Sequence, residues 1–136
     1  MKKYAILALA FLAGSGSAFA ANRAVADGGT TATAVCVGTA TADKADYAGG
    51  SGAVITTATS FIKTGFIIQC SSNSYVSVIN ASATLYQVGS GSGKGNQSFK
   101  GSSNGGAVVT NAVCTGTNAA CTQANADSAA TDASSM

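Results

Sequence analysis

The stretch GFIIQCSSNSYVSVIN, residues 65–80, decides the fold because it holds two strand-forming runs in succession. Its two halves are short and rich in β-branched and aromatic side chains, and they are separated by the turn-forming pair Ser72-Asn73. Both halves carry apolar residues at successive positions, as at Ile67-Ile68. Such strands lie in the centre of a sheet, or they have one apolar face that another element or another chain must cover.

The large apolar residues of the chain concentrate around this stretch. Of the 22 Val, Ile, Leu, Phe and Tyr residues after Ala20, 14 lie between Val54 and Val88. Further strand-like runs occupy residues 32–41, 53–59 and 82–88, with one or two late strands within residues 98–116. Turn signals separate these runs at the short, regular spacing that is typical of antiparallel sandwiches and barrels.

The sequence therefore predicts an all-β fold, a small antiparallel β-sandwich or barrel-like domain with two disulfides. We place the β-rich domain at residues 32–114, after an N-terminal extension at residues 21–31. Residues 115–136 have no large apolar side chain before Met136, and this low-complexity composition predicts a flexible C-terminal tail.

Residues 1–20 have the three parts of a secretory signal peptide. Two lysines are followed by an apolar run, and Ala18-Phe19-Ala20 matches the A-x-A cleavage pattern. Cleavage there leaves five basic and five acidic residues, a formal charge of zero. We expect a secreted protein in the periplasm, at the cell surface or outside the cell, without membrane insertion after cleavage. The scattered cations also lack the basic cluster that binds nucleic acid.

Four cysteines lie beyond the expected signal peptide, at Cys36, Cys70, Cys114 and Cys121. Export carries them to an oxidising compartment, where disulfides persist. Of the three possible pairings, proximity in the sequence favours Cys114 with Cys121, which leaves Cys36 with Cys70. A metal site is disfavoured because the chain has no histidine and no C-x-x-C pair.

The glycine-rich segment GSGSGKGNQSFKG, residues 89–101, has the look of a phosphate-binding loop. The motif G-x-x-x-x-G-K-[ST] fails here, because alignment on Gly93-Lys94 puts Val88 at the first glycine and Gly95 at the hydroxyl position. We interpret the segment as a flexible, exposed connector between strands, and we expect no cofactor.

Asp43 and Asp46 are the only close pair of carboxylates in the expected domain. Calcium accepts irregular oxygen ligands of this kind, but we favour a solvated turn at the start of the glycine-rich connector, residues 43–52. The chain has neither histidine nor glutamate, the usual general acids and bases at neutral pH. We therefore expect that the protein is not an enzyme.

The chain resembles the pilins that are assembled by a chaperone and an usher. The resemblance rests on the export signal, a short alternating segment at residues 30–37, two cysteines 34 residues apart at Cys36 and Cys70, and the strand-rich body. It implies that residues 30–37 complete the sheet of a neighbouring subunit. The C-terminal TDASSM differs from pilins in lacking a final apolar strand.

These observations predict a structural or adhesive protein of the cell surface or extracellular matrix, with itself or other surface proteins as partners and strand addition as one way of joining. The alternative is a soluble, disulfide-stabilised module that binds a carbohydrate or a protein. In that alternative, aromatic residues such as Tyr75 and Tyr86 stack on a sugar, whereas core packing is the favoured role for these rings.

Overall fold

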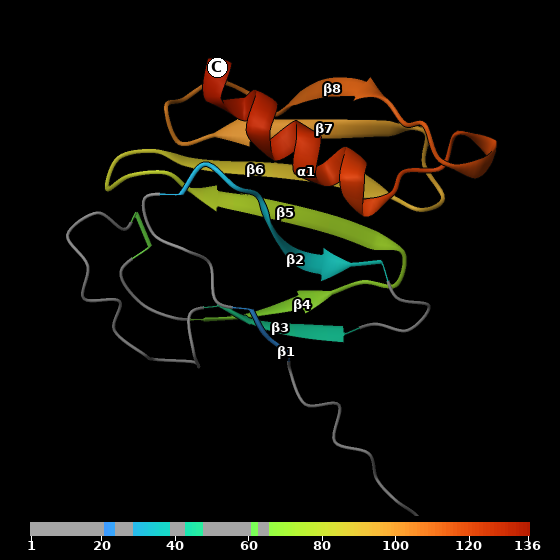
Figure 1. Cartoon of the computed structure of the whole chain (residues 1–136), viewed down its shortest axis with the longest axis horizontal. Coiled ribbons are helices and arrows are strands. Elements are labelled where there is room, and N and C mark those ends of the chain that lie inside the picture. Colours follow the sequence, from blue (N-terminus) through green and yellow to red (C-terminus); the bar gives the residue numbers. More distant parts are fainter. Residues whose placement is uncertain (1–20, 24–28, 39–42, 48–60, 63–65) are drawn as a thin grey trace, which may run out of the picture.

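The described part of the chain is mostly β-structure in the computed structural model (Figure 1). The structure describes residues 21–23, 29–38, 43–47, 61–62 and 66–136. The signal peptide expected at residues 1–20 and the strand expected at residues 53–59 lie outside these ranges.

Five strands form one antiparallel sheet in the order β2-β5-β6-β7-β8. They are β2 (Thr33–Val37), β5 (Ser74–Asn80), β6 (Tyr86–Ser92), β7 (Gln97–Ser102) and β8 (Val109–Val113). The strand predicted over residues 82–88 begins later, at Tyr86. The reason is local, because the Ser82 hydroxyl accepts hydrogen bonds from the Thr84 and Leu85 amides and holds these residues in a turn.

A second sheet has the order β1-β3-β4. Its strands are β1 (Ala21–Arg23), β3 (Asp43–Tyr47) and β4 (Phe66–Cys70). β3 runs antiparallel to β4 and parallel to β1. The turn predicted from residue 43 is therefore wrong for residues 43–47, because their backbone groups pair in a sheet between two neighbours.

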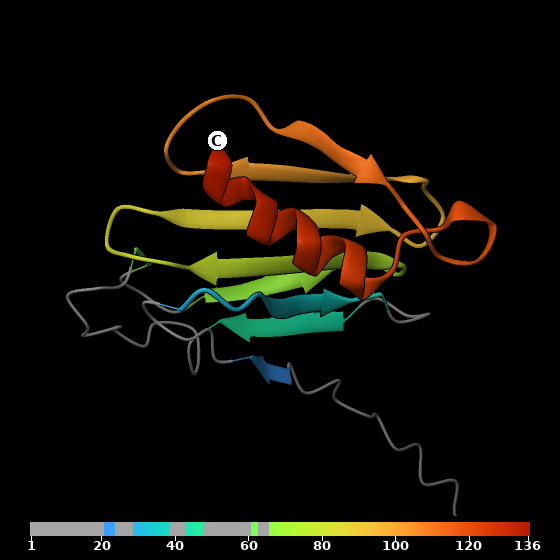
Figure 2. The same ribbon diagram turned by 45° about the horizontal axis from the view of Figure 1, so that its top comes forward.

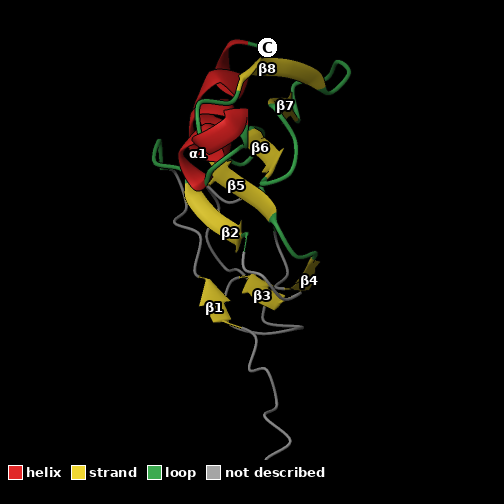
Figure 3. Cartoon of the chain, turned by 90° about the vertical axis from the view of Figure 1, so that its right-hand side faces the viewer, coloured by secondary structure: helices red, strands yellow, loops and turns green. Residues whose placement is uncertain are grey.

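The two sheets lie next to each other and are joined by the Cys36–Cys70 disulfide, which links β2 to β4. Figure 3 shows the second sheet next to β2, the edge strand of the five-stranded sheet. The mostly β fold is confirmed, whereas the predicted sandwich or barrel is not.

The prediction of a flexible tail over residues 115–136 is wrong. This segment contains the short 3-10 helices η1 (Thr117–Ala119) and η2 (Ala133–Ser135) on either side of the helix α1 (Gln123–Asp132). Figure 2 shows α1 lying across one face of β5, β6 and β7. Alanines at helical spacing turn towards the sheet and are completely buried, and they are Ala126, Ala129, Ala130 and Ala133.

Small side chains on both partners let α1 approach the sheet closely. Gly89 of β6 lies directly under the helix, and a Cβ atom built there would overlap the Ala126 carbonyl oxygen and the Ala130 amide nitrogen. Helix backbone and strand backbone are therefore in contact at this point. Only glycine fits at position 89 without moving the helix.

Polar contacts fix the helix on the sheet at both ends. Near its start, the buried Ser77 hydroxyl of β5 donates a hydrogen bond of 2.5 Å to Asp127, which also accepts one from Gln123 at 3.0 Å. Near its end, Lys100 of β7 donates to the Asp132 carbonyl oxygen at 3.3 Å. A lysine at this position also complements the negative end of the helix dipole.

The second disulfide, Cys114–Cys121, connects the end of β8 to the start of α1. Both cysteines are buried. The predicted pairing of all four cysteines is thus confirmed.

The glycine-rich segment 89–101 forms a hairpin, which corrects its interpretation as a flexible connector. β6 continues to Ser92, a short turn covers residues 93–96, and β7 begins at Gln97. The turn is closed by a hydrogen bond of 2.8 Å from the Gly95 amide to the Ser92 carbonyl oxygen. Two glycines of β6 allow other parts of the chain to approach the strand closely. Gly89 lies under α1, and a Cβ built at Gly91 would lie 2.9 Å from the Cβ of Cys121.

We expect Gly89→Ala to destabilise the fold by about 3 kcal/mol, because the added methyl group displaces the helix backbone. The matched change Gly95→Ala places its methyl group at 3.4 Å from Ser92, an ordinary contact, and should cost less than about 1 kcal/mol. Urea denaturation of the chain without residues 1–20 measures both. Equal costs for the two variants would contradict the close approach of α1.

The two disulfides should contribute unequally to stability because they close loops of different length. Cys36–Cys70 spans 34 positions and Cys114–Cys121 spans 7. On the loop-entropy relation, removal of the pairs as double alanine variants should cost about 4 and about 2.5 kcal/mol respectively. Urea denaturation of both variants under oxidising conditions tests this order, and the reverse order would refute it.

Candidate association surface

The five-stranded sheet has two faces, and α1 covers only one. Successive residues of a strand point to opposite faces, so residues such as Gly89 face α1 and their neighbours face away from it. On the far side, Phe99 of β7 is 41 % exposed and Val113 of β8 is 63 % exposed. The register pairs Val113 with Gln97, which lies on the same face of β7 as Phe99. Phe99 and Val113 thus share the uncovered face.

Val108, immediately before β8, belongs to the same surface. It is 71 % exposed, and its Cγ2 atom lies 3.3 Å from a Cβ built at Gly101. Gly101 pairs with Val88 and shares the face of Phe99. We name the set Phe99, Val108 and Val113 the apolar strip.

The opposite end of the same face is covered by other parts of the chain. A core of Val35, Cys36, Cys70 and Val78 lies there, with Ile62 and Ile68 packed against it. The ring of Phe61 stacks on Tyr86 at 5.7 Å between centroids. The face is therefore packed over β2 and over the Val78 part of β5. Among the described residues, nothing packs over β7 and β8 on this face.

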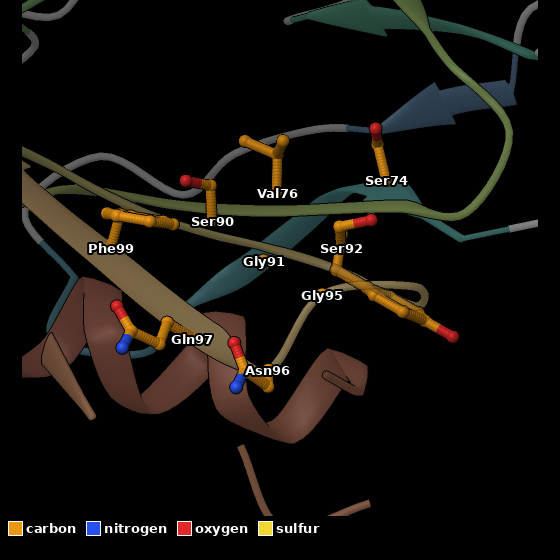
Figure 4. A pocket seen from close by; sticks show the side chains of 10 residues that line it. Ser74, Val76, Ser90, Gly91, Ser92, Gly95, Asn96, Gln97 and Phe99 are labelled. Carbon is orange, nitrogen blue, oxygen red and sulfur yellow. The ribbon is translucent and has the colours of Figure 1, made fainter. Parts of the chain in front are cut away.

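A hollow of about 410 Å³ lies beside the apolar strip, on the same face. It is lined by Ser74, Tyr75 and Val76 of β5, by Ser90, Gly91 and Ser92 of β6, and by Gly95, Asn96, Gln97 and Phe99. Figure 4 shows Ser74, Val76, Ser90 and Ser92 pointing to the side away from α1. Phe99 joins the hollow to the strip.

Neither the hollow nor the strip contains a charged side chain. Lys94 lies in the turn between β6 and β7, outside this lining. Lys100 is turned to the helix side, where it donates to Asp132. The open face is thus electrically neutral over the described residues.

The residues singled out by sequence reasoning lie elsewhere. Asp43 and Asp46 lie three positions apart in β3. Tyr86 stacks on Phe61, so its predicted packing role is confirmed. Tyr75 is half-buried, with its ring over Gly38, and it lines the hollow together with the more exposed ring of Phe99.

The strand-donor role implied by the pilin resemblance does not fit this arrangement. Residues 33–37 form β2, which pairs with β5 of the same chain. Cys36 is buried there and bonded to Cys70. Withdrawing this segment to serve a neighbour would break a ladder and a disulfide-linked core.

Both disulfides are consistent with a secreted or extracellular protein, because such bonds persist in oxidising compartments. Within the described residues, no helix has the length and apolar character needed to cross a membrane. Comparison of the chain with family models, with curated proteins and with solved structures gives no match.

The valines of the apolar strip should contribute little to folding. We expect Val108→Ser and Val113→Ser to change the free energy of unfolding by less than about 0.5 kcal/mol, because both side chains are already in water. By contrast, Val78→Ala removes two buried methyl groups and should cost about 2 kcal/mol. Urea denaturation at low protein concentration measures all three, and a large cost at Val108 or Val113 would show that the strip is covered in the monomer.

Proposed function

We propose that this chain is an exported structural or adhesive protein of the cell surface or extracellular matrix, and that copies of it associate through the apolar strip. The observation that carries this proposal is the exposure of Phe99, Val108 and Val113 on one uncharged sheet face. An apolar sheet face is stable when another layer covers it. In this chain α1 supplies that layer on one side only.

A second copy supplies the missing layer on the other side. The strip is neutral, so two identical strips meet without like-charge repulsion. Packing them together buries the valines and the phenylalanine of both chains, which is the main source of affinity between such surfaces. A two-fold axis between the copies makes the contact self-complementary. The two sheets then stack as the layers of a β-sandwich do.

The compartment and the composition support the same proposal. Disulfides hold the sheets and the helix together where no cellular machinery maintains the protein. The sequence is rich in Ala, Ser, Thr and Gly, and it has no histidine for acid–base chemistry. A monomeric binding module is the second candidate function, favoured by the hollow beside the strip.

The proposal predicts concentration-dependent association of the mature protein. Sedimentation velocity over a range of concentrations should detect dimers or larger species, and Val113→Lys should weaken association by about tenfold or more, because it places a charge in the apolar contact. The control Ala83→Lys adds the same charge at an exposed turn between β5 and β6 and should leave association unchanged.

Two outcomes would contradict the proposal. The first is a wild-type protein that stays monomeric at its highest soluble concentration. The second is equal weakening by Val113→Lys and Ala83→Lys, because this result would trace the effect to net charge alone.

A further inference from the structure

The hollow beside the apolar strip presents polar side chains that have no hydrogen-bond partner among the residues that the structure describes. In the described part of the chain, the side chains of Ser74, Ser90, Asn96 and Gln97 make no hydrogen bond to another residue. The Ser92 hydroxyl accepts one from the Lys94 amide and keeps its own proton free to donate. The lining therefore offers both donors and acceptors towards the open side.

An aromatic ring stands at the edge of these polar groups. Two rings line the hollow, Phe99 and Tyr75. Phe99 is 41 % exposed, whereas Tyr75 is half-buried with its ring over Gly38, so Phe99 is the ring more open to a ligand. A pyranose ring has an apolar face of C–H groups and an edge of hydroxyls. The apolar face suits contact with a phenyl ring, and the hydroxyls suit serine and amide side chains.

None of the described residues of this lining is charged, and this selects among ligands. A phosphorylated, sulfated or uronic-acid ligand would leave its anionic group without a cationic partner at the site. A purely apolar ligand would cover the serines and amides without replacing their hydrogen bonds to water. An uncharged, hydroxyl-rich ligand has no anionic group to pair, and its hydroxyls replace the hydrogen bonds that the serines and amides made to water.

We propose that the hollow is a binding site for a neutral polysaccharide, with Phe99 stacking on one sugar ring and Ser90, Asn96 and Gln97 hydrogen-bonding its hydroxyls. The hollow is open along the sheet face, so it admits an internal segment of a long chain. The volume of about 410 Å³ accommodates one or two sugar rings. This inference does not require self-association, because it uses the hollow and neither Val108 nor Val113. The two kinds of binding share Phe99, so a saccharide and a second copy of the chain compete for this ring.

The test uses the mature protein and a panel of neutral polysaccharides, namely cellulose, amylose, mannan, galactan and xylan. Retention on each is measured first, and the dissociation constant for the matching hexasaccharide follows by calorimetry. We expect retention on at least one member of the panel, unaffected by added salt. Phe99→Ala should raise the dissociation constant about tenfold or more, the loss typical of an aromatic anchor.

Matched variants separate stacking from general effects. Phe99→Tyr keeps the ring and should retain binding, whereas Gln97→Ala removes one hydrogen-bonding group at the rim and should weaken it. Asn104→Ala removes a similar amide from an exposed turn outside the hollow and should have no effect. Phe99 and Gln97 are both exposed, so unchanged urea denaturation of their variants confirms that the fold is intact.

Val113→Lys distinguishes this inference from the proposed function. Residue 113 lies outside the hollow, so the variant should lose self-association and keep, or gain, saccharide binding. Saccharide binding by a strictly monomeric protein would refute self-association and support the site. No retention on any member of the panel, retention that Phe99→Ala leaves unchanged, or retention only on anionic polysaccharides would overturn the site.

Discussion

The contact between α1 and Gly89 is the constraint on which the rest of the structure depends. Because the helix backbone touches the strand at this position, the helix covers one face of the sheet with alanines, beside the buried side chain of Ile79. The Cys114–Cys121 disulfide holds the start of α1, and the contacts of Ser77 and Lys100 fix its two ends. Large apolar residues are then free to collect on the other face, partly in the core around Val78 and partly exposed in the apolar strip. One covered face and one half-open face follow from a single close approach.

Much of the sheet could be predicted from the sequence because its strands are dense in β-branched and aromatic residues. β5 matches its run at both ends, and the cysteine pairing follows from proximity along the chain. The helix could not be found by a search for large apolar residues. Its signal lay in alanines at helical spacing and in the pairing of Thr122 with Asn125 at its start. The glycine-rich hairpin differs from its predicted role as a connector for a related reason. Gly89 is needed for the close approach of α1, which lies more than 30 residues later in the sequence.

The candidate site was even less visible in the sequence. Val108 and Val113 occur in a short run that reads as one more strand, and nothing local indicates which of its faces is covered. Only the position of α1 shows that these valines and Phe99 face water. The same holds for the hollow, whose serines and amides come from three strands and one turn. Residue types predicted a mostly β, disulfide-bonded chain, whereas only the pairing of distant strands shows which side chains form the open surface. Phe99 is exposed because α1 covers the opposite face of β7.

We propose that the uncovered sheet face becomes buried between copies of the chain. Hydroxyl-radical footprinting at low and high protein concentration tests this claim directly, because it reports the accessibility of individual side chains. Phe61 and Phe99 form a matched pair, with exposures of 38 % and 41 % on the same face, and only Phe99 belongs to the apolar strip. We expect modification of Phe99 to fall as the protein concentration rises, while modification of Phe61 stays constant. Equal modification of Phe99 at all concentrations, or protection of both rings alike, would contradict the proposal.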